Sequence, residues 1–242
     1  MHQYEVAVVF GTRPEAIKLA PLIRLLKQDP QFNVTVVNTG QHKELVDDVC
    51  SFFEIPVDVD LKVMSTGQTL EAVTGSVLSK FSAFLEQRTL DLVIAQGDTT
   101  SVFAVALSCF YRALPVAHVE AGLRTPDIFS PFPEEFNRRS VSMLASQHFA
   151  PTQTASNNLL REGVSSECIL VTGNTSIDAV KLAKQIVSNQ KPPSFVKKNT
   201  KMILVTCHRR ENFGKGVSEI IKSVENSRMI KVPQEAPHIR TN

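Results

Sequence analysis

Short apolar runs alternate with segments of helical spacing along this chain, and this alternation restricts its fold more than any other feature. Residues 5–10 form an apolar run, residues 11–13 a turn, and residues 16–26 repeat apolar side chains every three or four positions. Further apolar runs lie at 34–37, 92–95, 116–119 and 169–171. Short continuous runs of this kind are typical of parallel strands that helices cover on both faces. The pattern therefore predicts an α/β fold with a parallel sheet and crossover helices.

Two more segments have the spacing of buried helices. Residues 45–53 form one of them. The other carries an apolar stripe of Leu70, Val73, Val77, Leu78, Phe81, Phe84 and Leu85. Steps of three and four place these side chains on one helical face. Pro14 follows the first turn at a position where a helix tolerates proline, because the missing N–H would have no partner there.

The composition changes between residues 188 and 201, where Asn, Lys, Pro and Ser replace the apolar runs. We expect a linker at 188–201, after a Rossmann-like domain at 1–187. The rest, 202–242, predicts one strand at 202–206 and one helix at 216–225. One parallel strand with one helix can neither bury its faces nor complete its ladder of hydrogen bonds. We therefore expect an incomplete second Rossmann-like domain.

Charge, hydropathy and cysteine spacing exclude several classes of protein. The 26 Lys and Arg residues against 24 Asp and Glu leave a net charge of +2, too small to drive sequence-independent binding of nucleic acid. No apolar stretch approaches the roughly 18 residues of a membrane span. The four cysteines form neither a zinc motif nor a disulfide framework: Cys50, Cys109, Cys168 and Cys207. We expect a cytoplasmic protein that binds no nucleic acid, no membrane and no metal.

The first turn joins an expected strand to an expected helix at Gly-Thr-Arg-Pro-Glu-Ala-Ile-Lys, residues 11–18. Free backbone N–H groups at a helix start favour an anion. Arg13 can bind a phosphate through two hydrogen bonds, and Lys18 adds a positive charge one turn later. The turn lacks the Gly-Lys-Ser/Thr of a P-loop. A turn with solvated charges is the alternative interpretation, and the spacing alone leaves both open.

Acidic side chains follow two expected strands and open one expected helix. Asp98 comes after the run at 92–95, Glu120 closes the run at 116–119, and Glu134 begins a helical segment. The carboxyl ends of parallel strands meet at one edge, where such folds bind ligands. If the three carboxylates converge there, their repulsion raises the pKa of at least one, which can then take and return a proton. Alternatively, Asp98 only caps a helix and Glu134 only favours a helix start.

A second basic turn, His-Arg-Arg-Glu-Asn at 208–212, follows the strand expected at 202–206. A histidine and two arginines in that position suit a diphosphate group, with a solvated basic loop as the alternative. We therefore include His208 and Arg210 among the candidate site residues.

Seven motifs together resemble the bacterial non-hydrolysing UDP-N-acetylglucosamine 2-epimerase family, and they occur in that family's order. They are Gly-Thr-Arg-Pro-Glu-Ala-Ile-Lys (11–18), Gly-Gln-His (40–42), Gly-Asp-Thr-Thr (97–100), His-Val-Glu-Ala-Gly-Leu-Arg-Thr (118–125), Pro-Glu-Glu-Phe-Asn-Arg (133–138), Thr-Gly-Asn-Thr (172–175) and His-Arg-Arg-Glu-Asn (208–212). The resemblance covers residues 5 to about 225.

The resemblance implies a GT-B-like fold of two Rossmann-like domains with a UDP-sugar in the cleft between them. It also implies interconversion of UDP-N-acetylglucosamine and UDP-N-acetylmannosamine for surface polysaccharide synthesis. In this family UDP is eliminated to leave an acetamidoglucal and then added back, without a nicotinamide or other cofactor. Family members are commonly homodimers.

The resemblance also assigns roles to residues of this sequence. The family's catalytic carboxylates match Asp98, Glu120 and Glu134; its substrate-binding positions match Arg13 and Lys18; and further active-site positions match Arg138 and His208. We take His208 as catalytic, and Arg138 and Arg210 as substrate-binding. Gln41 and His42 lie in a motif that helps some members bind a second, activating UDP-N-acetylglucosamine.

The C-terminal part departs from the family pattern. Residues 227–242 contain Pro233 and Pro237 and do not resemble the family's continuation, including an Asp-Ser-Gly-Gly-type loop and a later Glu. We therefore expect a truncated or frameshifted product with severely reduced catalysis. Two alternatives to an epimerase stay open: a non-catalytic remnant or partner-binding fragment, and a GT-B glycosyltransferase.

Overall fold

The structure is a computed structural model, and it describes residues 3–40, 43–65, 67–188, 190–191, 218–219 and 222–223. The chain divides into two compact units, Met1–Ser188 and Asn189–Asn242. The described residues 218–219 and 222–223 of the second unit are helical. The strand expected at 202–206, most of the expected linker and most of the helix expected at 216–225 lie outside the described residues.

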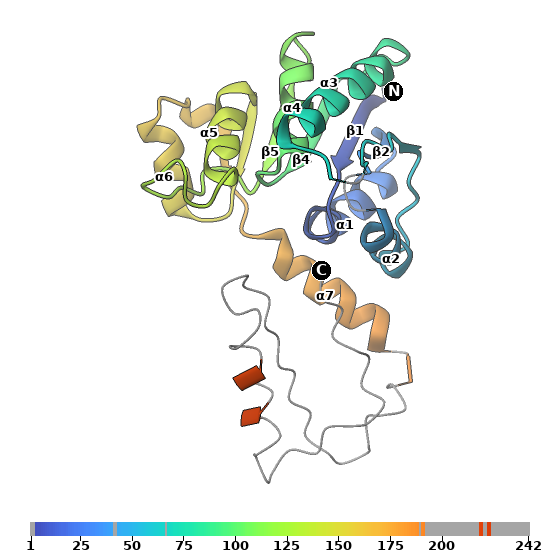
Figure 1. The fold of residues 1–242 in the computed structure, drawn as a ribbon. Helices are drawn as coiled ribbons and strands as arrows, with labels where there is room; N and C mark the ends of the chain where they lie inside the picture. The colour runs from blue at the N-terminus through green and yellow to red at the C-terminus, as the bar shows by residue number, and fades with distance from the viewer. Residues whose placement is uncertain are drawn as a thin grey trace. The chain divides into compact units, whose positions relative to one another are not determined.

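The first unit is built on a seven-stranded sheet, and each neighbouring pair of strands is parallel (Figure 1). Its strand order is β3-β2-β1-β4-β5-β6-β7. The strands are β1 (Tyr4–Phe10), β2 (Phe32–Asn38), β3 (Val59–Asp60), β4 (Leu92–Gln96), β5 (Val116–Val119), β6 (Gln147–Ala150) and β7 (Ile169–Val171). The predicted α/β fold with a parallel sheet is confirmed.

Helices cover both faces of this sheet. They are α1 (Arg13–Gln28), α2 (Lys43–Phe53), α3 (Leu70–Glu86), α4 (Thr100–Phe110), α5 (Glu134–Leu144), α6 (Gln153–Arg161) and α7 (Thr175–Ser188). A short 3-10 helix, Ser166–Cys168, precedes β7. Helix α1 packs against α2 and α7, whereas α4 packs against α3 and α5 (Figure 1). The two groups share no core cluster, because they lie on opposite faces of the sheet.

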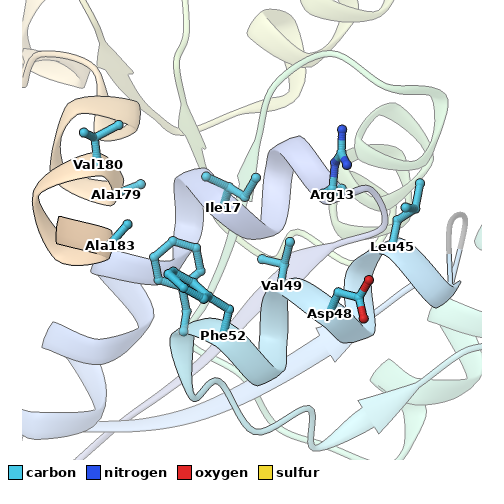
Figure 2. Close-up of a pocket in the computed structure, with 10 residues that line it drawn as sticks. Arg13, Ile17, Leu45, Asp48, Val49, Phe52, Ala179, Val180 and Ala183 are labelled. Carbon is cyan, nitrogen blue, oxygen red and sulfur yellow. The ribbon is translucent and has the colours of Figure 1, made fainter. Parts of the chain in front are cut away.

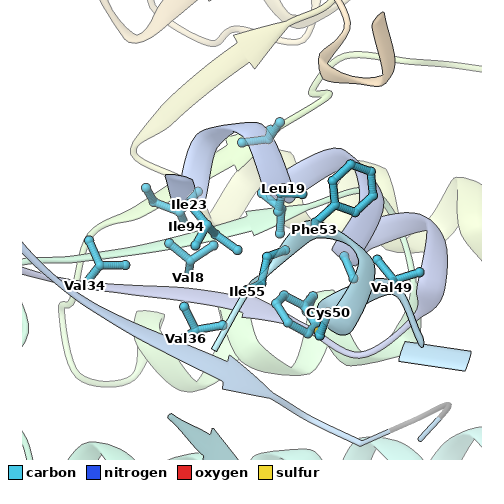
Figure 3. Close-up of a cluster of buried hydrophobic side chains, with 14 of the residues drawn as sticks. Val8, Leu19, Ile23, Val34, Val36, Val49, Cys50, Phe53, Ile55 and Ile94 are labelled. Atoms are coloured by element: carbon cyan, nitrogen blue, oxygen red, sulfur yellow. The ribbon is translucent and has the colours of Figure 1, made fainter. Parts of the chain in front are cut away.

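Strand β1 divides its side chains between these two faces. Val6, Val8 and Phe10 belong to the cluster under α1, α2 and α7, while Ala7 and Val9 belong to the cluster under α3 and α4. Such alternation follows from the two-residue period of a strand. Figure 3 shows the first cluster, in which side chains of β1 and β2 meet those of α1 and α2. The sheet is thereby fixed in register, because a slip of one residue would exchange the two faces.

Two cysteines pack within these cores. Burial, with a smaller effect of Asp47, raises the pKa of Cys50 to about 11. Burial also raises the pKa of Cys109 to about 12. Both thiols therefore stay protonated at neutral pH and pack as small apolar groups.

Strands β3, β6 and β7 differ from the expectation. Sequence analysis did not identify β3 or β6, which are short and, in β6, partly polar. The run at 169–171 was expected to be covered on both faces, and this is wrong, because Leu170 is 59% exposed and Val171 is 45% exposed. Strand β7 is the last strand of the sheet, so one side of it has no neighbouring strand among the described residues.

The described part of the chain contains no helix that is long and apolar enough to cross a membrane. Within the same residues, no group of three or more His, Cys, Asp or Glu side chains is arranged to hold a metal ion.

Candidate active site at the carboxyl edge of the sheet

Four turns lie at the carboxyl ends of strands β1, β4, β5 and β7. Because all four strands are parallel, their ends meet at one edge of the sheet. Hydrogen bonds join the four turns to one another. Residues that are far apart in the sequence therefore form one polar cluster. Five of the candidate residues belong to this cluster: Lys18, Asp98, Glu120, Glu134 and Arg138.

Glu120 lies at the centre of the cluster and binds side chains from three other elements. Its Oε2 accepts hydrogen bonds from Lys18 Nζ of α1 and from Gln96 Nε2 of β4, both at 2.5 Å. Its Oε1 accepts a bond from Asn174 Nδ2, in the turn after β7, at 2.9 Å. Its backbone is in the left-handed region, with φ of 66°. Non-glycine residues rarely adopt this conformation, and it is concentrated at functional sites.

Asp98 lies in the turn after β4 and forms an ion pair with Arg138 of α5. The same turn is held by Asn137, whose Nδ2 donates to the backbone oxygen of Asp98 at 2.9 Å. Burial raises the pKa of Asp98, the Arg138 guanidinium opposes this, and the charges of Glu134 and Glu120 raise it further. Glu134 and Glu120 therefore both lie within electrostatic reach of Asp98. Burial contributes more to the raised pKa than the repulsion that the sequence suggested.

Helix α5 begins with two glutamates in different surroundings. Glu134 is partly exposed and acts on Asp98 through its charge. Glu135 is fully buried, and it accepts bonds from Arg139 Nε at 2.7 Å and from the Thr125 N–H at 3.0 Å. It also forms an ion pair with Arg138 at 3.3 Å. Sequence analysis missed the role of Glu135, although arginines three and four positions later are a helical ion-pair signal.

The first turn differs from the expected anion-binding loop. Its Gly11 and Thr12 N–H groups donate to Glu15 Oε2, at 2.7 and 3.0 Å, so they are not free. Lys18, which was expected to contact substrate, forms an ion pair with Glu120. Arg13 is exposed at the start of α1. In this turn the charge available to an anion therefore comes from side chains rather than from the Gly11 and Thr12 amides.

Arg13 also lines a cavity of about 410 Å³ between α1, α2 and α7. Figure 2 shows that its other walls are mostly apolar, with Ile17 from α1, Val49 and Phe52 from α2, and Ala179, Val180 and Ala183 from α7. Asp48 is the second charged group that lines it. The cavity therefore touches the candidate site only through Arg13.

His118 supports the turn that carries Asp98. It is 1% exposed, and its Nε2 lies 2.7 Å from the Gly97 oxygen. A carbonyl accepts, so Nε2 carries the proton. Burial lowers the pKa of His118 to about 4, and the imidazole is therefore neutral at pH 7. No pattern in the sequence indicated this supporting role of His118.

Four further candidate residues lie outside the described residues: Gln41, His42, His208 and Arg210. Their assignments rest on the sequence alone.

Comparison with known proteins gives the same family for most of the chain. A sequence model of UDP-N-acetylglucosamine 2-epimerase matches residues 24–240. The Escherichia coli K12 protein named UDP-N-acetylglucosamine 2-epimerase is 47% identical over 224 residues, which are 89% of this chain and 60% of that protein. The Neisseria meningitidis serogroup A protein of the same name is 45% identical over 227 residues, with coverage of 91% and 61%.

A solved structure agrees. An epimerase crystal structure from Listeria monocytogenes matches with a TM-score of 0.80 at 42% identity, covering 93% of this chain and 61% of that one. The expected GT-B-like fold class is thereby confirmed. The chain spans about 60% of the length of the curated relatives it matches.

Proposed function

The chain belongs to the UDP-N-acetylglucosamine 2-epimerase family, and from that premise we propose that its site interconverts UDP-N-acetylglucosamine and UDP-N-acetylmannosamine. The observation that carries the proposal is the meeting of three carboxylates and two cations at one edge of the sheet. They are Asp98, Glu120 and Glu134 with Lys18 and Arg138. A relative from Neisseria meningitidis that is 46% identical has been crystallised bound to UDP-GlcNAc.

Inversion at C2 of this substrate needs a proton to leave a carbon that has no neighbouring carbonyl group. The C2–H bond becomes acidic only as the bond between C1 and the UDP oxygen breaks. The C–H electron pair then forms the C1–C2 double bond of an acetamidoglucal, and the C–O pair leaves with UDP. When UDP adds back to C1, a proton returned to the other face of C2 gives the manno epimer. No hydride is transferred, so the proposed reaction uses no nicotinamide.

The proposed roles of the carboxylates follow from their surroundings. Asp98, whose pKa is raised by burial, is the group suited to exchange a proton with one face of C2, and inversion needs a second acid to deliver a proton to the other face. Glu120 accepts hydrogen bonds on both oxygens, which fix its carboxylate in place, and in this proposal it stabilises positive charge at C1. Glu134 is the third catalytic carboxylate in this proposal.

The cations have a second task, which is to hold the departing diphosphate. Arg13 and Lys18 lie at the first turn, and Arg138 reaches Asp98 from α5. Guanidinium groups suit phosphate oxygens because they donate two parallel hydrogen bonds. His208 and Arg210 lie outside the described residues, and from the sequence we propose His208 as catalytic and Arg210 as substrate-binding.

We also propose a homodimer located in the cytoplasm. The three described cysteines, Cys50, Cys109 and Cys168, are free thiols, which suits a reducing compartment. Sedimentation of the purified chain would measure its oligomeric state, and a monomer at all concentrations would contradict the dimer.

The reaction can be tested by incubating the purified chain with UDP-N-acetylglucosamine in heavy water. We expect NMR to detect deuterium at C2 together with the manno epimer. Asp98→Asn should abolish both signals, because the amide cannot take the proton. Asp91→Asn is the matched control, since Asp91 accepts the Glu5 N–H at the opposite end of β4. A folded chain that binds UDP and shows no exchange would overturn the proposal for this chain.

A further inference from the structure

We propose that Glu15 is a positioning residue, whose carboxylate holds the turn that carries Arg13 against the turn that carries Asp98. That these two turns serve one reaction rests on the proposed function. The mechanical coupling between them rests on the contacts of Glu15 alone.

Glu15 joins two segments that are far apart in the sequence. Its Oε2 accepts the N–H groups of Gly11 and Thr12 in the turn after β1. Its Oε1 accepts the Thr99 hydroxyl, 84 residues away, at 2.7 Å. The Thr99 oxygen in turn accepts the Val102 N–H at 3.3 Å, so it caps the start of α4. A continuous line of hydrogen bonds therefore runs from the first turn, through one carboxylate, into α4.

This arrangement exceeds what a helix start requires. A capping glutamate in the first turn satisfies amides of its own helix start. The bond to Thr99 adds a partner from another strand–helix unit, next to Asp98. Glu15 is only 2% exposed, and burial raises its pKa, while the bonds from Gly11, Thr99 and Thr12 oppose that effect. Three donors match an ionised carboxylate, which only accepts.

The coupling has a consequence for the catalytic groups. Lys18 lies one helical turn after Glu15 on α1 and reaches Glu120, while Thr99 lies directly after Asp98. Fixing the start of α1 against the start of α4 therefore sets the separation between the cations of the first turn and the carboxylate of the second. A misplacement of about 1 Å between reacting groups can lower a rate by about 100-fold.

Amide chemical shifts of the chain without ligand test the coupling directly. Thr99→Val removes the hydroxyl and leaves Glu15 intact, so we expect the Gly11 and Thr12 amide resonances to move although the change is in another turn. Thr99→Ser keeps the hydroxyl and should restore them. Ser108→Ala is the control, because it removes a hydroxyl within α4 that donates to the Ala104 oxygen of the same helix. Melting temperatures show whether each variant is folded.

Unmoved Gly11 and Thr12 resonances in folded Thr99→Val would overturn the coupling. Glu15→Gln gives the reciprocal test, since its amide group faces N–H donors, and it should move the resonances of residues 97–102. This result needs no catalysis, so it stands even if the heavy-water experiment fails.

Kinetics test whether the coupling serves the reaction. For Thr99→Val we expect kcat of the C2 exchange to fall by about tenfold or more, with KM nearly unchanged, because ground-state contacts remain and alignment is lost. Thr99→Ser should recover most of kcat. Full kcat in Thr99→Val would overturn the positioning role while leaving the proposed epimerase activity in place.

Discussion

The starts of α1 and α5 lie at the same edge of the sheet and each buries a glutamate, but the partners of the two carboxylates differ. Glu15 accepts two backbone N–H groups and one hydroxyl, all of them uncharged. Glu135 forms ion pairs with Arg138 and Arg139 and also accepts one backbone N–H. Uncharged donors tie Glu15 to backbone turns, whereas cations tie Glu135 to side chains that carry charge.

This difference separates two tasks in the candidate site. The hydrogen bonds of Glu15 fix the position of the backbone in the turns after β1 and β4. The ion pairs of Glu135 fix the position of a charged side chain, since Arg138 pairs with both Glu135 and Asp98. A buried ion pair is costly to break, because the remaining partner keeps its desolvation cost. The two starts should therefore respond differently to the same substitution.

Glu135→Gln should have the largest effect. The substitution leaves Arg138, whose side chain is 13% exposed, without its buried counter-charge. We expect the free energy of unfolding to fall by about 4 kcal/mol, a typical loss when one partner of a buried ion pair is removed. Urea unfolding at pH 7 measures it. Glu134→Gln, next in sequence but partly exposed, is the control and should cost far less.

A loss in Glu135→Gln no larger than that in Glu134→Gln would break the comparison. It would mean that the two arginines find water or another acceptor, and that the position of Arg138 does not depend on Glu135.

His118 sharpens the comparison, because it is buried at the same edge without a charge. Burial is the main cause that lowers its pKa, from an ordinary 6.5 to about 4. The unfolded chain therefore binds a proton that the folded chain does not as the pH falls below 6.5. Stability from this residue is complete above pH 6.5 and is lost progressively down to pH 4, by about 3 kcal/mol in all.

The measurement is the difference in unfolding free energy between the protein and His118→Gln, taken from pH 7 to pH 4. Gln can still donate to the Gly97 oxygen but does not titrate. His148, the cross-strand neighbour whose pKa burial also lowers, is present in both proteins, so the difference reports His118 together with its repulsion by His148. An identical pH slope in the two proteins would show that His118 is not kept neutral by burial.

Much of the fold was predictable from the sequence, because strands that are buried on both faces consist almost entirely of apolar residues. The run at 116–119 and the stripe ending at Leu85 became β5 and α3. For the candidate site, the sequence predicted only its location, at the carboxyl ends of the strands. Whether the Gly11 amide binds an anion or Glu15 depends on a side chain that folds back within its own turn. The choice of a hydrogen-bond partner produces no periodic pattern of residue types, so the sequence does not predict it.

Glu15→Gln should have a smaller effect on stability than Glu135→Gln. The amide keeps one oxygen as an acceptor, but its NH2 group faces donors, so at least one buried partner loses its hydrogen bond. That loss costs about 2 kcal/mol, and relief from burying a charge offsets part of it. No cation is left unpaired among the described partners of Glu15, which is why the loss stays below that of Glu135→Gln. Urea unfolding at pH 7 measures the change, with Glu71→Gln, an exposed glutamate in the first turn of α3, as control. A loss equal to that of Glu135→Gln would show that the charge of the carboxylate, rather than its neutral donors, decides the stability of both helix starts.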